Sequence, residues 1–590
     1  MRRTLQTLAV LLILLSQPAC SEVTPSSVPS PFPEFTEDPA TATIAPTLPV
    51  ETKEPMTPTA IPSTKAQQIL QAMTLDQKIG QLFVIGFDGT DVDDDLRAMI
   101  EESHIGGVIY FARNIADPLQ TAKLSAKLQR IAAESGNPGL IIAIDQEGGR
   151  VARLTEKTGF TEFPSAMALG ATGDPHNAFL AAQAMAQEMR QAGINADFAP
   201  DLDVNNNPLN PVIGIRSFSS DPAIVAAFGV EAVKGLQSEG VMAFGKHFPG
   251  HGDTDIDSHK GLPVIDHPLD RLQSVEFVPF EAAIKADVSG IMTAHVEFPS
   301  IDPTNTPATV SQPVLTGLLR ETMGYEGLII TDSLEMAALG EAGYPTEIAG
   351  SAAFMAGADL LLFNRDHDLH RRAIADLKQK LETGKISMER LDESVLRILS
   401  VKEEFGVLES PTEAGTPQVM QPDTVTLSRK LALNSVTLVK NEAGLLPFGP
   451  EQEVTMVEFP QTEGFAHLLS FSSFLLPAEP TQSDLNLLFT MTRGDQALLF
   501  LTTDANMNGD QAEAVRQAIA HGIPTVVVAV RNPHDILAFP ELSTYLVSYG
   551  SNPPTLDALE AILHGAEAAK GKLPIEIPGM YHIDDGILLE

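Results

Sequence analysis

Short apolar runs alternate with amphipathic stretches from about residue 66 to residue 405. The spacing of apolar positions predicts helices over 117–133 and 221–237, between runs too short and too uniformly apolar for helices. Near-continuous apolar strands separated by helices are typical of a parallel sheet that is covered on both faces. About eight such units predict a TIM-type (β/α)8 barrel. The expected strands are 79–86, 107–111, 140–144, 196–199, 241–244, 290–294, 328–331 and 359–363.

Polar side chains follow several of these runs directly. The expected strand ends carry Asp145, Asp201 and Asp203, His295, and Asp332. Any one of them alone is more often a helix cap or a loop carboxylate. Their recurrence at successive strand ends predicts a site at the carboxyl-terminal mouth of the barrel.

The pattern changes after residue 405. A Pro/Thr-rich linker precedes apolar runs at 454–457, 497–501 and 525–530, with a helical pattern at 510–520 and a closing strand expected at 572–578. We predict a barrel domain over 66–408, a linker over 409–424 and a smaller α/β sandwich domain over 425–590. The second domain shows no comparable cluster of polar strand ends, so we expect it to serve packing or substrate positioning.

The first 65 residues carry the pattern of an exported protein. A basic start, the apolar stretch 8–15 and small residues ending at Cys20 predict a signal peptide over 1–20, and residues 21–65 form a Pro/Thr/Ser-rich linker. Cys20 is the single cysteine, so the chain has no internal disulfide. We expect Cys20 to be lipidated and to attach the protein to a membrane, with simple cleavage near Ala19 and secretion as the alternative.

The net charge of −39 limits the partners of this chain. Nucleic acids and anionic lipid surfaces are repelled by such a charge, so neither is expected to bind. The sequence has no Gly-rich phosphate loop, zinc-type Cys/His spacing or nucleotide fingerprint, and we expect neither a cofactor nor a metal. It does not indicate an oligomeric state.

The stretch 245–259, GKHFPGHGDTDIDSH, concentrates the chemistry of the chain. A metal site is one interpretation, but Pro and Gly residues interrupt the helical spacing that a His pair needs. A solvated surface loop is the second. The third is a sugar-processing site, in which Asp257 lies two residues before His259 and accepts its proton, so that the pair acts as a general acid/base.

The residues 246–252, KHFPGHG, together with Asp257-Ser-His259, resemble the signature of glycoside hydrolase family 3, in its β-N-acetylglucosaminidase branch. The resemblance spans about residues 66–575. It implies that His259 protonates the leaving oxygen and that Asp257 is its partner. In 331–336, TDSLEM, it implies that Asp332 is the nucleophile, whereas Glu335 is the competitor that we expect to make structural contacts.

The same resemblance implies a pocket for the non-reducing sugar. It is expected to be lined by Asp145, Arg216, Lys246 and His247, which offer the donors and acceptors that hydroxyl groups require. Arg150 is not included among these residues; a pair with Glu147 as part of the scaffold is the alternative role for it. The residues that contact a 2-acetamido group are not identified.

The resemblance implies a hydrolase that releases terminal β-linked N-acetylhexosamine from peptidoglycan fragments or chitooligosaccharides, and a carboxylate nucleophile predicts that it retains the anomeric configuration. The carbohydrate substrate is then the expected partner, and the expected location is outside the cytoplasm. Three alternatives stay open. A β-N-acetylglucosaminide phosphorylase would use phosphate as the acceptor, a β-glucosidase would take a different sugar, and a sugar-binding lipoprotein would have no activity.

Overall fold

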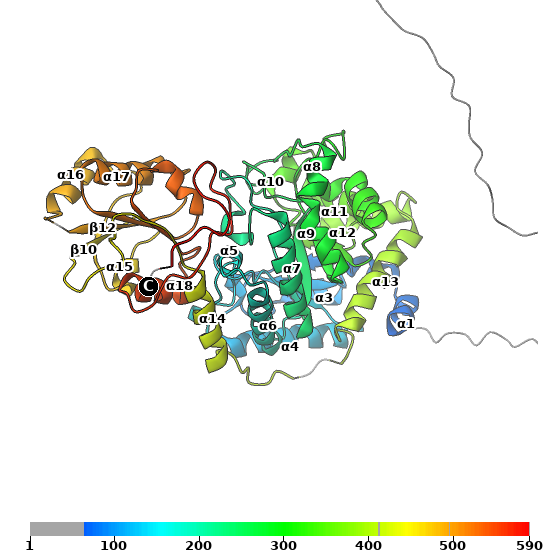
Figure 1. Ribbon diagram of the computed structural model, residues 1–590. Coiled ribbons are helices and arrows are strands. Elements are labelled where there is room, and N and C mark those ends of the chain that lie inside the picture. Colours follow the sequence, from blue (N-terminus) through cyan, green and yellow to red (C-terminus); the bar gives the residue numbers. More distant parts are fainter. Residues whose placement is uncertain (1–63, 411–412, 495, 589–590) are drawn as a thin grey trace, which may run out of the picture. The chain divides into compact units, whose positions relative to one another are not determined.

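The first domain is a nearly closed barrel of eight parallel strands surrounded by helices (Figure 1), as predicted. The computed structural model describes residues 64–410, 413–494 and 496–588. Each strand is buried along its whole length, which explains why the strands read as continuous apolar runs. The strands are β1 (Phe83–Ile85), β2 (Gly107–Tyr110), β3 (Ile141–Ile144), β4 (Ala196–Asp197), β5 (Met242–Phe248), β6 (Gly290–Thr293), β7 (Leu328–Ile330) and β8 (Leu361–Phe363).

The seam between β7 and β8 has the fewest paired residues in the barrel. Strand β8 pairs with β1 at three positions, whereas β7 and β8 share one bridge, Ile330 to Leu360. Four backbone hydrogen bonds also cross this seam, among them Thr331 N–H to the carbonyl of Leu360 at 3.1 Å. Beyond that bridge the Oγ1 of Thr331 accepts the backbone N–H of Leu362 at 2.9 Å. A side-chain hydroxyl therefore substitutes there for a backbone acceptor of the sheet.

The helices of the first domain lie outside the strands (Figure 1). Helix starts follow the usual capping chemistry: Asp221 accepts from the N–H groups of Ala223 and Ile224, and Pro222 opens the helix that follows. The helices are α1 (Lys65–Ala72), α2 (Leu75–Gly80), α3 (Asp94–Glu101), α4 (Pro118–Glu134), α5 (Ala166–Ala171), α6 (His176–Gln191), α7 (Pro222–Ser238), α8 (Leu269–Ser274), α9 (Phe277–Lys285), a π-helix (Pro313–Thr322), α10 (Ala337–Glu341), α11 (Thr346–Ala356), α12 (His367–Glu382) and α13 (Met388–Glu404).

Two strand boundaries differ from the prediction. The run 79–86 begins with the end of α2, and its strand starts only at Phe83. Strand β5 instead continues past the expected end and carries Lys246 and His247 within it. It can do so because the polar side chains of these residues find buried partners, while the carbonyl of Lys246 accepts the N–H of Leu202 at 2.6 Å.

The second domain is a three-layer α/β/α sandwich around a six-stranded sheet in the order β11-β10-β12-β13-β14-β9, in which only β9 runs antiparallel. Figure 1 shows α16 and α17 on one face and α15 and α18 on the other. The two faces form separate cores. The elements are α14 (Pro422–Ser435), β9 (Thr437–Asn441), β10 (Val454–Glu458), α15 (Phe465–Leu468), β11 (Ser472–Leu475), α16 (Gln482–Met491), β12 (Ala497–Thr502), α17 (Gly509–Ala520), β13 (Thr525–Ala529), β14 (Thr544–Val547) and α18 (Pro553–Leu563).

The closing strand expected at 572–578 is not formed. The backbone of this segment is hydrogen-bonded elsewhere: Lys572 N–H donates to Ala171 at the end of α5, and Leu573 N–H donates to Asp585. The segment therefore ties the second domain to the barrel. The Oγ of Ser165 adds a bond across the same boundary, to the carbonyl of Tyr549 at 2.7 Å.

The predicted signal peptide, Cys20 and residues 21–63 of the predicted linker lie outside the described residues; the linker ends earlier than predicted, since α1 begins at Lys65. Within the described part, none of the helices has both the length and the apolar character needed to cross a bilayer.

Candidate active site

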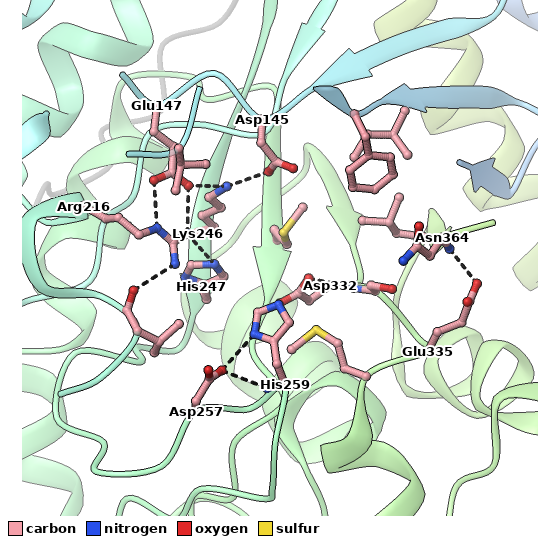
Figure 2. A pocket seen from close by; sticks show the side chains of 18 of the residues that line it. Asp145, Glu147, Arg216, Lys246, His247, Asp257, His259, Asp332, Glu335 and Asn364 are labelled. Atoms are coloured by element: carbon pink, nitrogen blue, oxygen red, sulfur yellow. Dashed lines mark hydrogen bonds and ion pairs between the residues drawn. The ribbon is translucent and has the colours of Figure 1, made fainter. Parts of the chain in front are cut away.

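All seven residues expected to act on a sugar line one cavity of about 720 Å³ at the carboxyl-terminal mouth of the barrel (Figure 2). They are Asp145, Arg216, Lys246, His247, Asp257, His259 and Asp332. The lining residues lie between positions 109 and 364 and belong to the first domain alone. The barrel topology thus brings together side chains that are far apart in the sequence.

One side of the pocket is a buried network of charges (Figure 2). The ammonium group of Lys246, 2% exposed, lies 2.9 Å from Asp145 and 2.7 Å from Glu147. Arg216 donates twice to Glu147, from Nε and Nη2, each at 2.8 Å. Burial lowers the pKa of Lys246, but the two carboxylates outweigh burial and leave that pKa above its ordinary value. Lys246 and Arg216 are therefore fixed cations.

His247 lies next to this network as a neutral ring. Its Nδ1 lies 2.7 Å from the carboxylate of Asp203, and its Nε2 lies 3.3 Å from Arg216. Since a guanidinium only donates, Nε2 accepts and Nδ1–H donates to Asp203. Burial and the charge of Arg216 lower the pKa of His247 to about 4.

Asp201, Asp203 and His247 place potential ligand atoms within 4.8 Å of one another, the arrangement that a metal ion would need. The guanidinium of Arg216 lies 3.6 Å from Asp201, so a positive charge already faces this group. Burial and the neighbouring Asp203 raise the pKa of Asp201 to about 8. A proton held by Asp201 accounts for this acidic pair without an ion.

Asp332 lies two residues after the end of β7 and faces the cavity (Figure 2). Its Oδ1 accepts the N–H of Ser333 at 2.7 Å. Burial raises the pKa of Asp332, but His295, His247 and that N–H outweigh burial and hold the pKa below its ordinary value. The carboxylate is therefore ionised at neutral pH.

Glu335, the competing carboxylate, is already engaged. Its Oε1 accepts the N–H of Asn364 at 2.6 Å and lies 3.1 Å from Nε2 of His370. Figure 2 shows it turned toward Asn364 and away from Asp332. These are structural contacts of the kind expected from the sequence.

The acid/base pair stands on the loop after β5. Asp257 Oδ1 lies 2.9 Å from Nδ1 of His259 and accepts the N–H of the same residue at 3.0 Å. The His259 side chain is 62% exposed and that of Asp257 only 18%. With Nδ1–H bound to Asp257, Nε2 is the ring atom left to exchange a proton. His259 also lies within electrostatic range of Asp332.

His251 anchors this loop. Its buried ring lies 2.8 Å from the Oγ1 of Thr254 and 3.0 Å from the Oγ of Ser258, the residue between Asp257 and His259. Gly252 permits the loop to pass the barrel, since a Cβ at this position would lie 1.9 Å from the carbonyl oxygen of Val204. The loop is thereby fixed before the acid/base segment and at its middle residue.

The Arg150–Glu147 pair, considered from the sequence as an alternative, is not formed. Glu147 pairs with Arg216 and Lys246, whereas Arg150 makes no ion pair with it. The roles of Asp203 and His251 were not anticipated. The only sequence signal for Asp203 was its place at a strand end, and the spacing of His251 indicated nothing specific.

Residues 74–401 match the family described as "Glycosyl hydrolase family 3 N terminal domain". The chain is 33% identical to "Beta-hexosaminidase A" of Pseudoalteromonas piscicida over 554 residues, covering 83% of this chain and 92% of that protein. It is 30% identical to "Beta-N-acetylglucosaminidase/beta-glucosidase" of Cellulomonas fimi, covering 86% and 94%. A solved glycoside hydrolase family 3 β-N-acetylglucosaminidase from Paenibacillus sp. str. FPU-7 superposes with a TM-score of 0.80 at 39% identity, over 86% of this chain and 99% of that one. Fold, pocket and sequence agree: this chain belongs to glycoside hydrolase family 3.

Proposed function

We propose that the protein removes terminal, non-reducing β-linked N-acetylhexosamine, in particular N-acetylglucosamine, through a covalent glycosyl-enzyme intermediate. The observation that carries the proposal is the convergence of two different groups on one pocket. An ionised carboxylate, Asp332, follows a barrel strand, and an imidazole with its own carboxylate, His259 with Asp257, stands on a neighbouring loop. The names of the relatives support the same sugar class.

In the first step a carboxylate oxygen of Asp332 attacks the anomeric carbon. His259, protonated on both nitrogens, gives its Nε2 proton to the departing oxygen as the glycosidic bond breaks. Asp257 accepts from Nδ1–H throughout and stabilises the charged imidazolium that this step requires. In the second step the neutral His259 takes a proton from water, which attacks the anomeric carbon and releases Asp332.

The remaining pocket residues hold the sugar. Lys246 and Arg216 present fixed donors, Asp145 presents acceptors, and His247 lies beside them. Because Glu147 fixes both cations in place, their geometry does not depend on bound substrate. Preorganised groups of this kind favour the transition state since they need no rearrangement during the reaction.

An imidazole acid suits this pocket for an electrostatic reason. Asp145, Glu147 and Asp332 already place negative charge around the sugar, and a carboxylate acid would add one more. A neutral imidazole avoids that repulsion after it has given up its proton. The same property would favour phosphate as an acceptor, so sugar 1-phosphate formation is part of the test below.

Glucoside hydrolysis is the second candidate activity, because the Cellulomonas fimi relative carries both names. An aryl N-acetylglucosaminide should be assayed beside the matching glucoside and xyloside, with and without phosphate. We expect the N-acetylglucosaminide to be cleaved fastest. NMR of the first product from the β-glycoside should show the β-anomer, and an α-anomer would contradict Asp332 as the nucleophile.

We further propose that the protein is exported and attached through a lipid on Cys20, where it acts on peptidoglycan fragments or chitooligosaccharides. The basic start and apolar stretch before Cys20 support export. Mass spectrometry of the membrane fraction tests this directly. A mature N-terminus other than acylated Cys20 would exclude the anchor.

A further inference from the structure

Asn210 is a buried side chain, 3% exposed, in the loop that follows β4. It precedes Pro211 and Val212, which line the cavity, but is not itself among the lining residues. Its side-chain amide makes hydrogen bonds at both ends. A residue in this position acts on the reaction through the segments that it holds, so its partners decide its role.

The oxygen of the Asn210 amide holds the segment that leads to Arg216. Oδ1 accepts the N–H of Val212 at 2.9 Å and that of Ile213 at 2.7 Å. Ile213 precedes the short 3-10 helix Gly214–Arg216, whose last residue is the arginine proposed to bind the sugar. An asparagine that accepts backbone N–H groups two and three residues ahead fixes the turn in which such a helix starts. The place of Arg216 in the pocket therefore depends on this amide oxygen.

The nitrogen of the same amide holds the acid/base loop, residues 249–261 after β5. Nδ2 donates to the carbonyls of His251 and Gly252, each at 2.9 Å. The buried His251 ring lies 3.0 Å from the Oγ of Ser258, the residue before His259. A flipped amide would turn its nitrogen to two N–H donors and its oxygen to two carbonyls, so only one orientation fits. Hydrogen bonds thus run from Asn210 to the neighbour of the proposed acid.

His259 depends on this loop for its position. Its side chain is 62% exposed, and its hydrogen-bond partner Asp257, at 2.9 Å, stands on the same loop. The pair can therefore keep its own contact while the loop shifts relative to Asp332. General acid catalysis requires the proton donor within hydrogen-bond reach of the leaving oxygen. A shifted loop should then lose protonation of the leaving group, while the residues that bind the sugar stay in place.

We propose that Asn210 is a positioning residue for this reaction, which couples the segment that ends in Arg216 to the loop that carries His259. The sugar site and the proton donor then keep a fixed spacing. The inference rests on the proposed function and deepens it, and it gives Asn210 no contact with substrate. Removal of the amide should impair protonation of the leaving group selectively, whereas a purely structural residue would affect all substrates alike.

The measured quantity is the ratio of kcat/KM for phenyl over 2,4-dinitrophenyl β-N-acetylglucosaminide. Phenol needs a proton to leave and dinitrophenol does not, so a loss of sugar binding common to both cancels. We expect Asn210→Ala to lower this ratio about tenfold, because two hydrogen bonds to the acid/base loop are lost. Asn210→Asp should lower it as well, since an ionised carboxylate still accepts from Val212 and Ile213 but cannot donate to the loop. If Asn210→Ala does not fold, Asn210→Asp replaces it in every comparison.

Asn195→Ala is the matched control. Asn195 is also buried, 4% exposed, and its amide also binds backbone at both ends, donating to the carbonyl of Leu140 at 3.0 Å and accepting the N–H of Ile142 at 2.8 Å. It precedes β4 and so lies at the other end of that strand from the pocket. Its removal should lower stability and leave the ratio unchanged. An equal fall of the ratio in both variants would contradict a specific role for Asn210.

A double-mutant cycle with His259→Ala tests whether Asn210 acts through the acid. Without His259 there is no proton donor to displace, so Asn210→Ala should leave the ratio of the His259→Ala protein unchanged. A further tenfold fall in that background overturns the proposal. An unchanged ratio in both Asn210→Ala and Asn210→Asp overturns it as well.

Failure of the proposed function gives a different result. If the protein cleaves aryl glucosides and neither N-acetylglucosaminide, the sugar assignment fails and the same ratio is measured with the glucosides. If it cleaves no glycoside, the function fails, and amide hydrogen exchange tests the placement of the loop. Asn210→Ala should then speed exchange at His251, whose N–H donates to Asp203 at 2.6 Å, and Asn195→Ala should not. Equal exchange in the two variants overturns the coupling.

Discussion

Replacement of His259 by alanine separates protonation of the leaving group from every other step. The imidazole makes one hydrogen bond, to Asp257, and the side chain is 62% exposed, so its removal leaves neither a cavity nor a buried unpaired charge. The fold and the sugar-binding network should therefore survive. What is lost is the proton that the departing oxygen needs and, later, the base that activates water.

The size of the loss depends on the leaving group. General acid catalysis contributes about 10²–10⁴-fold, and we expect the upper part of this range for alkyl or sugar leaving groups. An activated aryl leaving group needs little protonation, so kcat/KM should fall by less than about tenfold, since it reports the first step alone. Turnover of the same substrate should fall much further, because water attack lacks its base. Asp257→Ala removes one hydrogen bond from a largely solvated ring and should cost only about tenfold.

The assay compares an activated aryl N-acetylglucosaminide with an unactivated one in stopped-flow and steady-state measurements. His259→Ala should show a burst of the aryl product, followed by slow turnover that azide accelerates. His267→Ala is the matched control, since it breaks another Asp–His pair at 2.7 Å in the same region, outside the pocket lining. Equal losses with both substrates and no burst would refute the assignment and leave His259 as a binding residue.

Three further predictions concern charge. Glu147→Gln should lower the free energy of unfolding by about 3 kcal/mol in urea, because it leaves a buried cation pair undercompensated, whereas Asp557→Asn in an exposed pair should cost less than about 1 kcal/mol. The acid limb of kcat/KM should lie below pH 3.8, because the pKa of Asp332 is held below that ordinary value and activity is lost as this carboxylate protonates; a limb well above pH 4 contradicts this. Burial lowers the pKa of Lys402 from 10.5 to about 7. Between these two pH values the unfolded chain binds more protons than the folded one, so the free energy of unfolding should rise with pH, by up to about 1.36 kcal/mol per pH unit, relative to Lys402→Met.

The sequence predicts the barrel because its strands are buried on both faces, and it predicts the pocket residues because they follow those strands. It does not predict which charges pair inside the pocket. Glu147 pairs with Arg216, which lies 69 positions later in the sequence, and nothing in that spacing indicates that the two residues are partners. Arg150 is the example: its proximity to Glu147 in sequence suggested a pair, but the Gly148–Gly149 turn sends the two side chains to different neighbours.

The second domain was predicted less well for a related reason. Its strands 454–457, 497–501 and 525–530 are apolar and were recognised, whereas β9, β11 and β14 were not. Strand β11 is largely exposed at the sheet edge and lacks the apolar pattern on which such predictions depend. Asp504 and Arg531 follow β12 and β13 and form an ion pair at 2.7 Å. Nothing in the sequence indicates that their loops lie against the barrel, which Asn506 contacts through the carbonyl of Pro208.

The seam between β7 and β8 has a consequence for how the molecule opens. Amide hydrogen exchange reports the free energy of local opening, and the β7–β8 seam, with one bridge, has fewer paired residues than the four-residue pairing of β2 with β3. We expect the amides of Thr331 and Leu362 to exchange with deuterium before those of β2 and β3. The carboxylate of Asp332 would then lie next to the strands of the barrel that open first, while the strands on the opposite side stay paired.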